Sequence, residues 1–327
     1  MDEVKKKKRV AVLVGGGGCG LVSAAAADEL HKAGLLDDVV LYVGTSVGGL
    51  NACVLAVGMA MGKGTDLLME AWARIKSNAD VYTPDLAAAV EHPWAHPIDD
   101  ALMTDDFFRG PGACKVSPLV AMVQDILGGW STERLAAAGA PQVLTRAVSP
   151  DGMRAQTLQG DLVVMALGTS AIPGVFPPQW GRTDGGAVDN EPIDVALAQG
   201  AEEIIVLFCG PEDPPTTATD DPITVRVTDP APPAVTGFQN VLRELQGLTA
   251  RGESLADQAA AKAEAAGIQV LYVYPRADTG SALQFEPGNR EALGREAGRL
   301  AVADARALGW LPALPVASPD PAPPAAG

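Results

Sequence analysis

Short, uninterrupted runs of hydrophobic residues alternate along this chain with longer amphipathic segments. Continuous Val, Ile and Leu runs are typical of strands buried on both faces of a parallel sheet, and amphipathic segments of the helices that cover it. We therefore expect an α/β fold of three layers (αβα), with a mostly parallel central sheet. The turn-forming segment Ser149–Gly152 predicts one antiparallel strand pair at an edge of this sheet. The predicted strands are Val10–Val14, Val39–Val43, Val143–Val148, Ile204–Phe208, Ile223–Val227 and Val270–Tyr274. The predicted helices are Leu21–Ala33, Val47–Met61, Thr65–Lys76, Asp161–Gly168, Pro192–Gln199, Leu242–Ala266 and Arg290–Leu308.

Two stretches interrupt this alternation. Residues 79–118 contain prolines, paired acids and scattered aromatics and are interpreted as an irregular, lid-like insertion, while 210–233 are rich in Pro, Thr and Asp and predict a long surface loop. No internal repeat or linker divides the chain. We expect one catalytic domain over residues 9–310, preceded by a flexible basic segment (1–8) and followed by a disordered Pro/Ala-rich tail (311–327).

Composition narrows the class of partner. The chain has 24 Lys and Arg against 40 Asp and Glu, a net charge of −16. An acidic surface argues against nucleic acid as a partner and against broad electrostatic docking on anionic membranes. The basic run Lys5–Arg9 has two readings, a solvated chain end or a transient contact with membrane phosphates.

The compartment is predicted from the cysteines and from the distribution of apolar residues. The four cysteines are far apart and form no CxxC pair, which argues against a disulfide scaffold and a metal site. No stretch has the pattern of a secretory signal or a membrane span. We expect a cytoplasmic protein that contacts membranes at most peripherally and needs no metal or other cofactor.

A glycine-rich loop, Gly15–Gly20, joins the first predicted strand to the first helix. Such a loop turns several backbone N–H groups toward a ligand, and the helix end behind it favours negative charge. Its first, third and sixth residues spell GxGxxG, and Asp37 or Asp38 lies near the spacing of a ribose-binding acid. The same loop could be an oxyanion hole. Taken alone, the loop could either bind a dinucleotide or form an oxyanion hole.

The segment Gly44–Gly48 has the form GxSxG and lies between a predicted strand and a predicted helix. This arrangement is typical of a nucleophile elbow, in which the turn exposes the serine hydroxyl at the end of a strand. Ser46 is therefore a candidate nucleophile; the alternative is a Gly/Ser-rich turn without chemistry.

The base for such a nucleophile is not predicted to be a histidine. His31 falls within a helix, and His92 and His96 precede prolines in the irregular insertion. A carboxylate is then the next candidate. Asp184, in the segment Asp184-Gly185-Gly186, is such a carboxylate, although an isolated Asp-Gly is also typical of a turn or helix cap.

Together these motifs resemble the patatin-like phospholipase family, which uses a Ser–Asp dyad. The glycine-rich loop, the GxSxG and the DGG of Asp184–Gly186 occur in the family's order, and Gly168–Pro178 is similar to the stretch that precedes the family's catalytic Asp. The resemblance covers about residues 9–200.

The resemblance implies a serine acyl hydrolase that cleaves carboxylic esters of lipids, as a phospholipase A, lysophospholipase or lipid esterase. Ser46 would be the nucleophile and Asp184 the base, with an acyl-enzyme between two half-reactions. The oxyanion hole would come from the N–H groups of Gly16, Gly17 and Gly18. The residues expected to support these motifs are Gly15, Cys19, Gly20, Gly44, Gly48, Gly185 and Gly186.

One departure from the family's pattern leaves an alternative open. The family usually has Arg or Lys where this chain has Cys19, so a pseudoenzyme that binds an acyl lipid or a protein with little hydrolysis is a second hypothesis. A nucleotide-binding protein is a third. Asp189 and Asn190 are expected to cap the following helix or brace the loop of Asp184. The insertion aromatics would line an acyl entrance, form a lid or pack under a loop; they are Trp94, Phe107 and Phe108.

Overall fold

The computed structural model describes residues 7–85, 112–149, 154–211 and 260–312. Its main sheet has the strand order β6-β5-β2-β1-β8-β9, with β7 paired to β5. β1, β2, β5, β8 and β9 are parallel, and β6 and β7 run antiparallel to β5. The predicted mostly parallel sheet is thus confirmed, as is the antiparallel edge pair. The strands are β1 (Arg9–Leu13), β2 (Val39–Thr45), β5 (Gln142–Val148), β6 (Ala155–Leu158), β7 (Thr183–Asp184), β8 (Glu203–Leu207) and β9 (Gln269–Val273).

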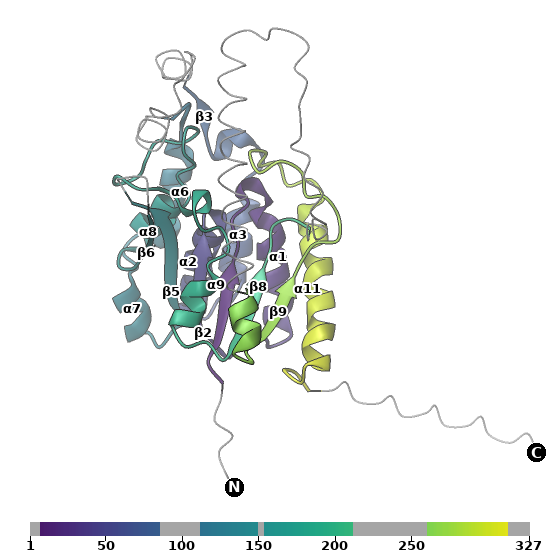
Figure 1. Ribbon diagram of the computed structural model, residues 1–327. Coiled ribbons are helices and arrows are strands. Elements are labelled where there is room, and N and C mark those ends of the chain that lie inside the picture. The colour runs from purple at the N-terminus through teal and green to yellow at the C-terminus, as the bar shows by residue number, and fades with distance from the viewer. Residues whose placement is uncertain (1–6, 86–111, 150–153, 212–259, 313–327) are drawn as a thin grey trace, which may run out of the picture.

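Helices cover both faces of this sheet. Alternate side chains of a strand point to opposite faces, and since every residue of β1 is buried, both faces must be covered. On β1, Ala11 and Leu13 join the larger core, whereas Val10 and Val12 join a smaller core with α9 and the helical residues 260–265. In Figure 1, α9 lies on one side of the sheet and α1, α2 and α3 on the other. The larger layer contains α1 (Gly20–Lys32), α2 (Val47–Ala60), α3 (Asp66–Ala73), α6 (Ser117–Leu127), α8 (Leu162–Thr169) and α11 (Arg290–Ala307); α9 is Ile193–Ala198.

Two α-helices in the described part of the chain were not predicted from the sequence. α6 begins at Ser117, and α7 (Thr132–Ala137) is capped by the Ser131 side chain, which accepts the Arg134 N–H. Near the two ends of the 79–118 insertion, the short strands β3 (Thr83–Pro84) and β4 (Cys114–Lys115) pair in antiparallel fashion. The predicted strand Ile223–Val227 and most of the predicted helix Leu242–Ala266 lie outside the described residues.

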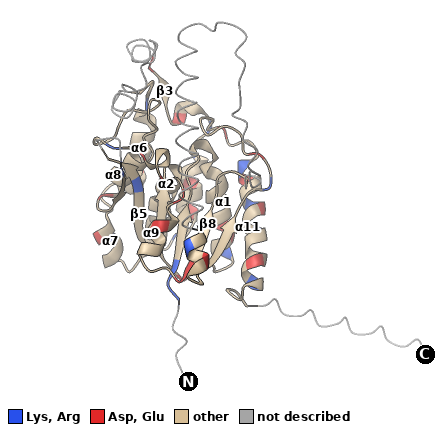
Figure 2. Cartoon of the chain, in the orientation of Figure 1, with Lys and Arg blue, Asp and Glu red and all other residues tan. Residues whose placement is uncertain are grey.

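The described residues of the basic run contact acidic side chains at the start of β8. Arg9 is buried and forms an ion pair with Glu203 at 2.7 Å, and Lys7 contacts the same carboxylate at 3.1 Å. The Lys8 N–H donates to Glu202 at 2.8 Å. Figure 2 shows the blue start of the chain beside red residues there. For Arg9, therefore, the solvated reading is wrong.

Within the described ranges, no helix combines the length and apolar character that crossing a bilayer requires.

Candidate active site

Three chain segments meet where neighbouring strands end. The glycine-rich loop follows β1, and Ser46 follows β2, which is paired to β1 in parallel. β7 places Asp184 opposite Ala147, at the carboxyl end of β5. Because the carboxyl ends of parallel strands share one edge, motifs that are far apart in sequence lie together there.

Ser46 occupies a strained turn between β2 and α2. Its φ is 55° and its ψ −132°, a conformation that non-glycine residues seldom adopt. The turn is tight because α2 begins against the end of β1: a Cβ on Gly48 would lie 2.1 Å from the Leu13 carbonyl oxygen. The Ser46 N–H donates to the buried Thr169 hydroxyl at 2.9 Å, and that hydroxyl donates to the Arg146 carbonyl. The elbow is therefore held by α8 and β5 as well as by its own glycines.

The Ser46 hydroxyl donates a hydrogen bond to Asp184. Its Oγ lies 2.6 Å from Asp184 Oδ2, and both residues are nearly inaccessible, at 6% and 4% exposure. The other carboxylate oxygen accepts the Gly186 N–H at 2.7 Å. Burial raises the pKa of Asp184 to about 7, and the two hydrogen bonds only partly offset this. A carboxyl with that pKa exchanges protons near neutral pH.

Asp189 and Asn190 brace the site. Asp189 forms an ion pair with Arg146 at 2.6 Å, and its carbonyl accepts the Thr45 hydroxyl at 2.9 Å, next to the elbow. Asn190 packs so close to Gly15 that a Cβ there would lie 2.2 Å from its Oδ1. The Asp189 N–H donates to the Gly185 carbonyl at 2.8 Å, and a Cβ on Gly186 would lie 2.9 Å from Asn190 Oδ1, so the prediction that they brace the loop of Asp184 is confirmed. The capping prediction is wrong, because Pro192 precedes α9 and no side chain caps that helix.

The glycine-rich loop lies beside Ser46: a Cβ on Gly15 would be 2.9 Å from the Ser46 Cβ. Within the loop, Gly17–Cys19 form one 3₁₀ turn and Gly20 begins α1. The Gly18 N–H already donates to the Ala282 carbonyl at 2.7 Å. In the described ranges, the N–H groups of Gly16 and Gly17 have no such acceptor.

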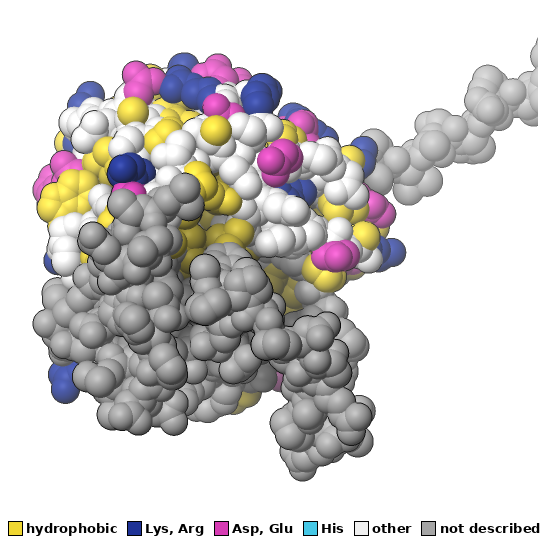
Figure 3. All heavy atoms as spheres, turned by 90° about the horizontal axis from the view of Figure 1, so that it is seen from above, with side chains coloured by type: hydrophobic (Ala, Val, Ile, Leu, Met, Phe, Trp, Pro, Cys, Tyr) yellow, Lys and Arg dark blue, Asp and Glu magenta, His cyan; other side chains and the backbone are white. Residues whose placement is uncertain are grey.

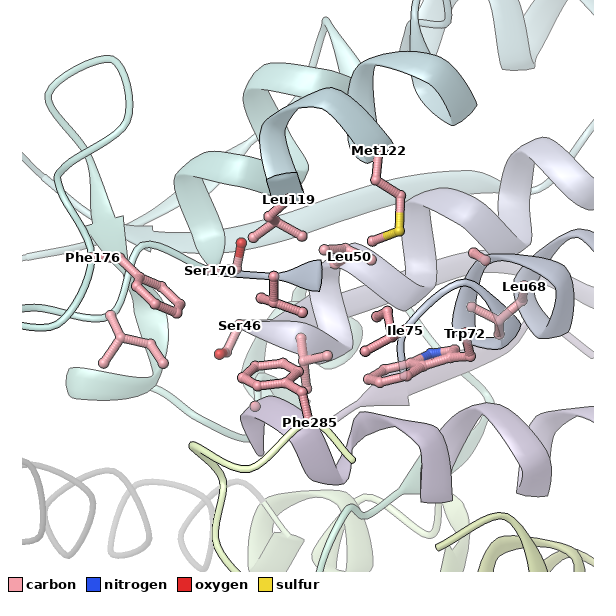
Figure 4. Close-up of a pocket in the computed structure, with 15 residues that line it drawn as sticks. Ser46, Leu50, Leu68, Trp72, Ile75, Leu119, Met122, Ser170, Phe176 and Phe285 are labelled. Atoms are coloured by element: carbon pink, nitrogen blue, oxygen red, sulfur yellow. The ribbon is translucent and has the colours of Figure 1, made fainter. Parts of the chain in front are cut away.

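An apolar cavity of about 40 Å³ extends from Ser46 into the larger core. In Figure 4, Ser46 and Phe176 lie toward one end, whereas Trp72 and Leu68 lie toward the other. The Trp72 indole N–H donates to Asn51 at 2.9 Å, which fixes the ring. The lining residues are Gly17, Ser46, Val47, Leu50, Leu68, Ala71, Trp72, Ile75, Val81, Leu119, Met122, Ser170, Ile172, Phe176 and Phe285.

Figure 3 looks onto the molecule from the side where the strands end. Hydrophobic side chains form a band on the described part of this face. A narrow apolar cavity fits a thin hydrocarbon chain better than a charged or bulky group.

Sequence reasoning missed most of this cavity wall. Trp72, Met122 and Phe285 come from α3, α6 and the loop before α11. Their only signal was apolar periodicity, which does not distinguish a cavity wall from ordinary core. The insertion aromatics Trp94, Phe107 and Phe108 lie outside the described residues.

The other candidates contribute no group to the Ser46–Asp184 pair. Cys19 is buried, with its sulfur 3.5 Å from the Thr279 carbonyl oxygen and 3.4 Å from that of Gly280. His31 lies on α1, with its ring nitrogen 3.8 Å from Asp37; His92 and His96 are not described. Among the described side chains, no three His, Cys, Asp or Glu lie together as a metal site would require.

Comparison with known proteins places the chain in a family. A family model described as patatin-like phospholipase matches residues 11–197. This is more than half of the 327 residues, so the chain belongs to the patatin-like phospholipase family. The resemblance noted from the motifs is thereby confirmed. No curated protein matches the chain.

The solved structures that are similar to the chain include two of low sequence identity to it. The crystal structure of VipD from Legionella pneumophila is 12% identical, with 91% of this chain and 67% of VipD covered and a TM-score of 0.40. That of the type III effector protein ExoU is 17% identical, with 91% of this chain and 53% of ExoU covered and the same TM-score of 0.40. The chain thus spans about half of ExoU.

Proposed function

We propose that this chain is a serine acyl hydrolase that cleaves carboxylic esters of lipids through Ser46 and Asp184. The observation that carries the proposal is the 2.6 Å hydrogen bond from a strained serine to a buried carboxylate, at the wall of an apolar cavity. Membership of the patatin-like phospholipase family supports the lipid ester as substrate.

In the first half-reaction, Ser46 Oγ attacks the ester carbonyl carbon while its proton passes to Asp184 Oδ2. The C=O bond opens to a tetrahedral oxyanion, which the N–H groups of Gly16 and Gly17 would stabilise. The C–O bond to the alcohol then breaks, and the leaving oxygen takes the proton back from Asp184. Ser46 is left as an acyl ester.

In the second half-reaction, Asp184 takes a proton from water, whose oxygen attacks the acyl carbon. Collapse returns the proton to Ser46 Oγ and releases the fatty acid. A base works best when its pKa lies near the working pH, so the raised pKa of Asp184, about 7, suits this role. The acyl chain would occupy the cavity between Ser46 and Trp72.

A pseudoenzyme remains a second candidate because of the glycine loop. One of the three N–H groups assigned to the oxyanion hole, that of Gly18, is already bonded to Ala282. An oxyanion hole with fewer free donors stabilises the transition state less, and each donor contributes about 10²- to 10³-fold in rate.

Hydrolysis of p-nitrophenyl esters over a series of acyl-chain lengths distinguishes the two candidates. Hydrolysis of phosphatidylcholine in vesicles is measured in parallel, as the lipid substrate. The hydrolase requires turnover that Ser46→Ala abolishes while the variant stays folded. Turnover no faster than that of Ser46→Ala would reject the hydrolase in favour of the pseudoenzyme.

A further inference from the structure

A strap formed by residues 279–286, between β9 and α11, lies on the glycine-rich loop. The two are in backbone contact: Gly18 donates to Ala282, and a Cβ on Gly18 would lie 1.7 Å from the Gln284 carbonyl oxygen. The Cys19 sulfur faces the Thr279 carbonyl in the same contact. A shift of the strap would therefore release or displace the loop beneath it.

Arg290, the first residue of α11, holds this strap. Its side chain is buried, at 4% exposure. The guanidinium donates to four strap carbonyls, those of Thr279 at 2.8 Å, Ser281 at 2.9 Å, Gln284 at 2.5 Å and Glu286 at 3.1 Å. The planar fork of an arginine can serve several acceptors in this way, whereas a lysine offers three donors from one point.

The charge of Arg290 is not neutralised by an acid in the part of the chain described. Its described partners are carbonyl oxygens, and no carboxylate forms an ion pair with it there. The guanidinium also borders the loop, since a Cβ on Gly18 would lie 3.2 Å from its Nη1. The loop, Gly15–Gly20, contains no cationic side chain of its own. A buried cation that borders the glycine-rich loop adds positive potential to that loop.

We propose that Arg290 is a positioning residue for the glycine-rich loop, whose N–H groups would form the oxyanion hole. It fixes the strap, the strap fixes Gly18, and Gly16 and Gly17 are thereby held as donors beside Ser46. The inference rests on the proposed hydrolase function. It concerns residues beyond the stretch 11–197 that the family model matches.

The strap also connects the loop to the acyl cavity. Phe285 lines the cavity, and its N–H donates to Asn78 at 2.8 Å. The Tyr82 hydroxyl donates to the neighbouring Leu283 carbonyl at 3.0 Å. An assay for the glycine-rich loop should therefore use an ester with a short acyl group, so that a change in the cavity wall has little effect on the measured rate.

The test compares Arg290→Met and Arg290→Lys with Arg299→Met, which removes an exposed arginine of the same helix. With p-nitrophenyl acetate, Arg290→Met should lower kcat by about 10- to 100-fold with a much smaller change in KM, the scale expected when catalytic groups are misplaced. Arg290→Lys should retain part of the rate, and Arg299→Met all of it. An unchanged kcat in folded Arg290→Met overturns the proposal. If the Met variant does not fold, the same comparison is made with Lys.

A second readout does not depend on activity. The strap covers Cys19, so its release should make that thiol react faster with iodoacetamide, measured by peptide mass spectrometry. Faster labelling in the Arg290 variants than in Arg299→Met supports the proposal, and equal labelling overturns it. If the wild type shows no Ser46-dependent turnover, the proposed function fails and this labelling alone decides the role of Arg290.

Discussion

Replacing Asp184 with asparagine should stabilise the folded protein, and more so at pH 8 than at pH 5. The carboxyl is buried, which raises its pKa from 3.8 to about 7. Asparagine has nearly the same shape, and its oxygen can accept the Gly186 N–H. Its amide would donate to Ser46 Oγ, which reverses the wild-type hydrogen bond from Ser46 to Asp184. That reversal does not depend on pH, whereas the loss of the ionisable carboxyl does.

The size of the effect follows from the two pKa values. At pH 5 the unfolded chain has lost the Asp184 proton while the folded protein keeps it, which costs the folded state about 2 kcal/mol. Above pH 7 both states are ionised and the cost reaches about 4 kcal/mol. The stability of the wild type thus falls as pH rises from 3.8 to 7. Asparagine has no such cost. The unfolding free energy of Asp184→Asn minus that of the wild type should therefore grow by about 2 to 3 kcal/mol between pH 5 and pH 8.

Urea unfolding of both proteins at the two pH values measures this difference. Any pH-independent effect of the asparagine contacts cancels when the two pH values are compared. Asp304→Asn, which changes an exposed carboxylate of α11, is the matched control and should show no such growth. An advantage of Asp184→Asn that is equal at pH 5 and pH 8 would refute the reasoning. The variant should also lose ester turnover, as expected when a destabilising group is kept for function.

Four further predictions concern the same site. The kcat/KM of the wild type should rise with pH through about 7 as Asp184 loses its proton; a profile flat from pH 5 to 9 contradicts this. Thr169→Val leaves the buried Ser46 N–H without an acceptor and should cost about 1 to 3 kcal/mol in unfolding free energy, with a lower kcat. Thr169→Ser should restore both, and a Val variant equal to wild type would show that the Thr169 hydroxyl does not hold the turn at Ser46. Trp72→Ala should lengthen the cavity and move the preferred ester to longer chains, whereas an unmoved preference would place the acyl chain elsewhere. EDTA should leave turnover unchanged, and inhibition reversed by added metal would count against the metal-free mechanism.

The parts of the fold that were predictable from sequence are those determined by local patterns. The continuous hydrophobic run Val10–Val14 corresponds to β1 at Arg9–Leu13, and Val270–Tyr274 to β9 at Gln269–Val273. The glycine loop and Ser46 could be placed at strand ends from the sequence, because each motif directly follows a predicted strand. That the two strands are neighbours comes from the structure.

Helices α6 and α7 were missed because residues that are typical of turns, such as proline and serine, are also typical of helix N-termini. Pro118 marked the end of the irregular insertion in the sequence, yet it lies in the first turn of α6, where proline is favoured because its missing N–H would be unpaired anyway. Ser131 caps α7 in the usual way, and that signal was available in the sequence.

The cavity and the strap could not be predicted, because they depend on contacts between distant segments. Arg290 and Gly18 are 272 residues apart in the sequence, and nothing near either residue indicates the other. An arginine at the start of an amphipathic helix is normally solvated. Only the packing of α11 against α1 brings it over the glycine loop.

Reaction with a fluorophosphonate, followed by peptide mass spectrometry, tests the central claim most directly. Ser46 Oγ should displace fluoride and carry the label, with no label on that peptide in Ser46→Ala and a much slower reaction in Asp184→Asn. Labelling of another residue, or a rate that does not depend on Asp184, would contradict the assignment of nucleophile and base.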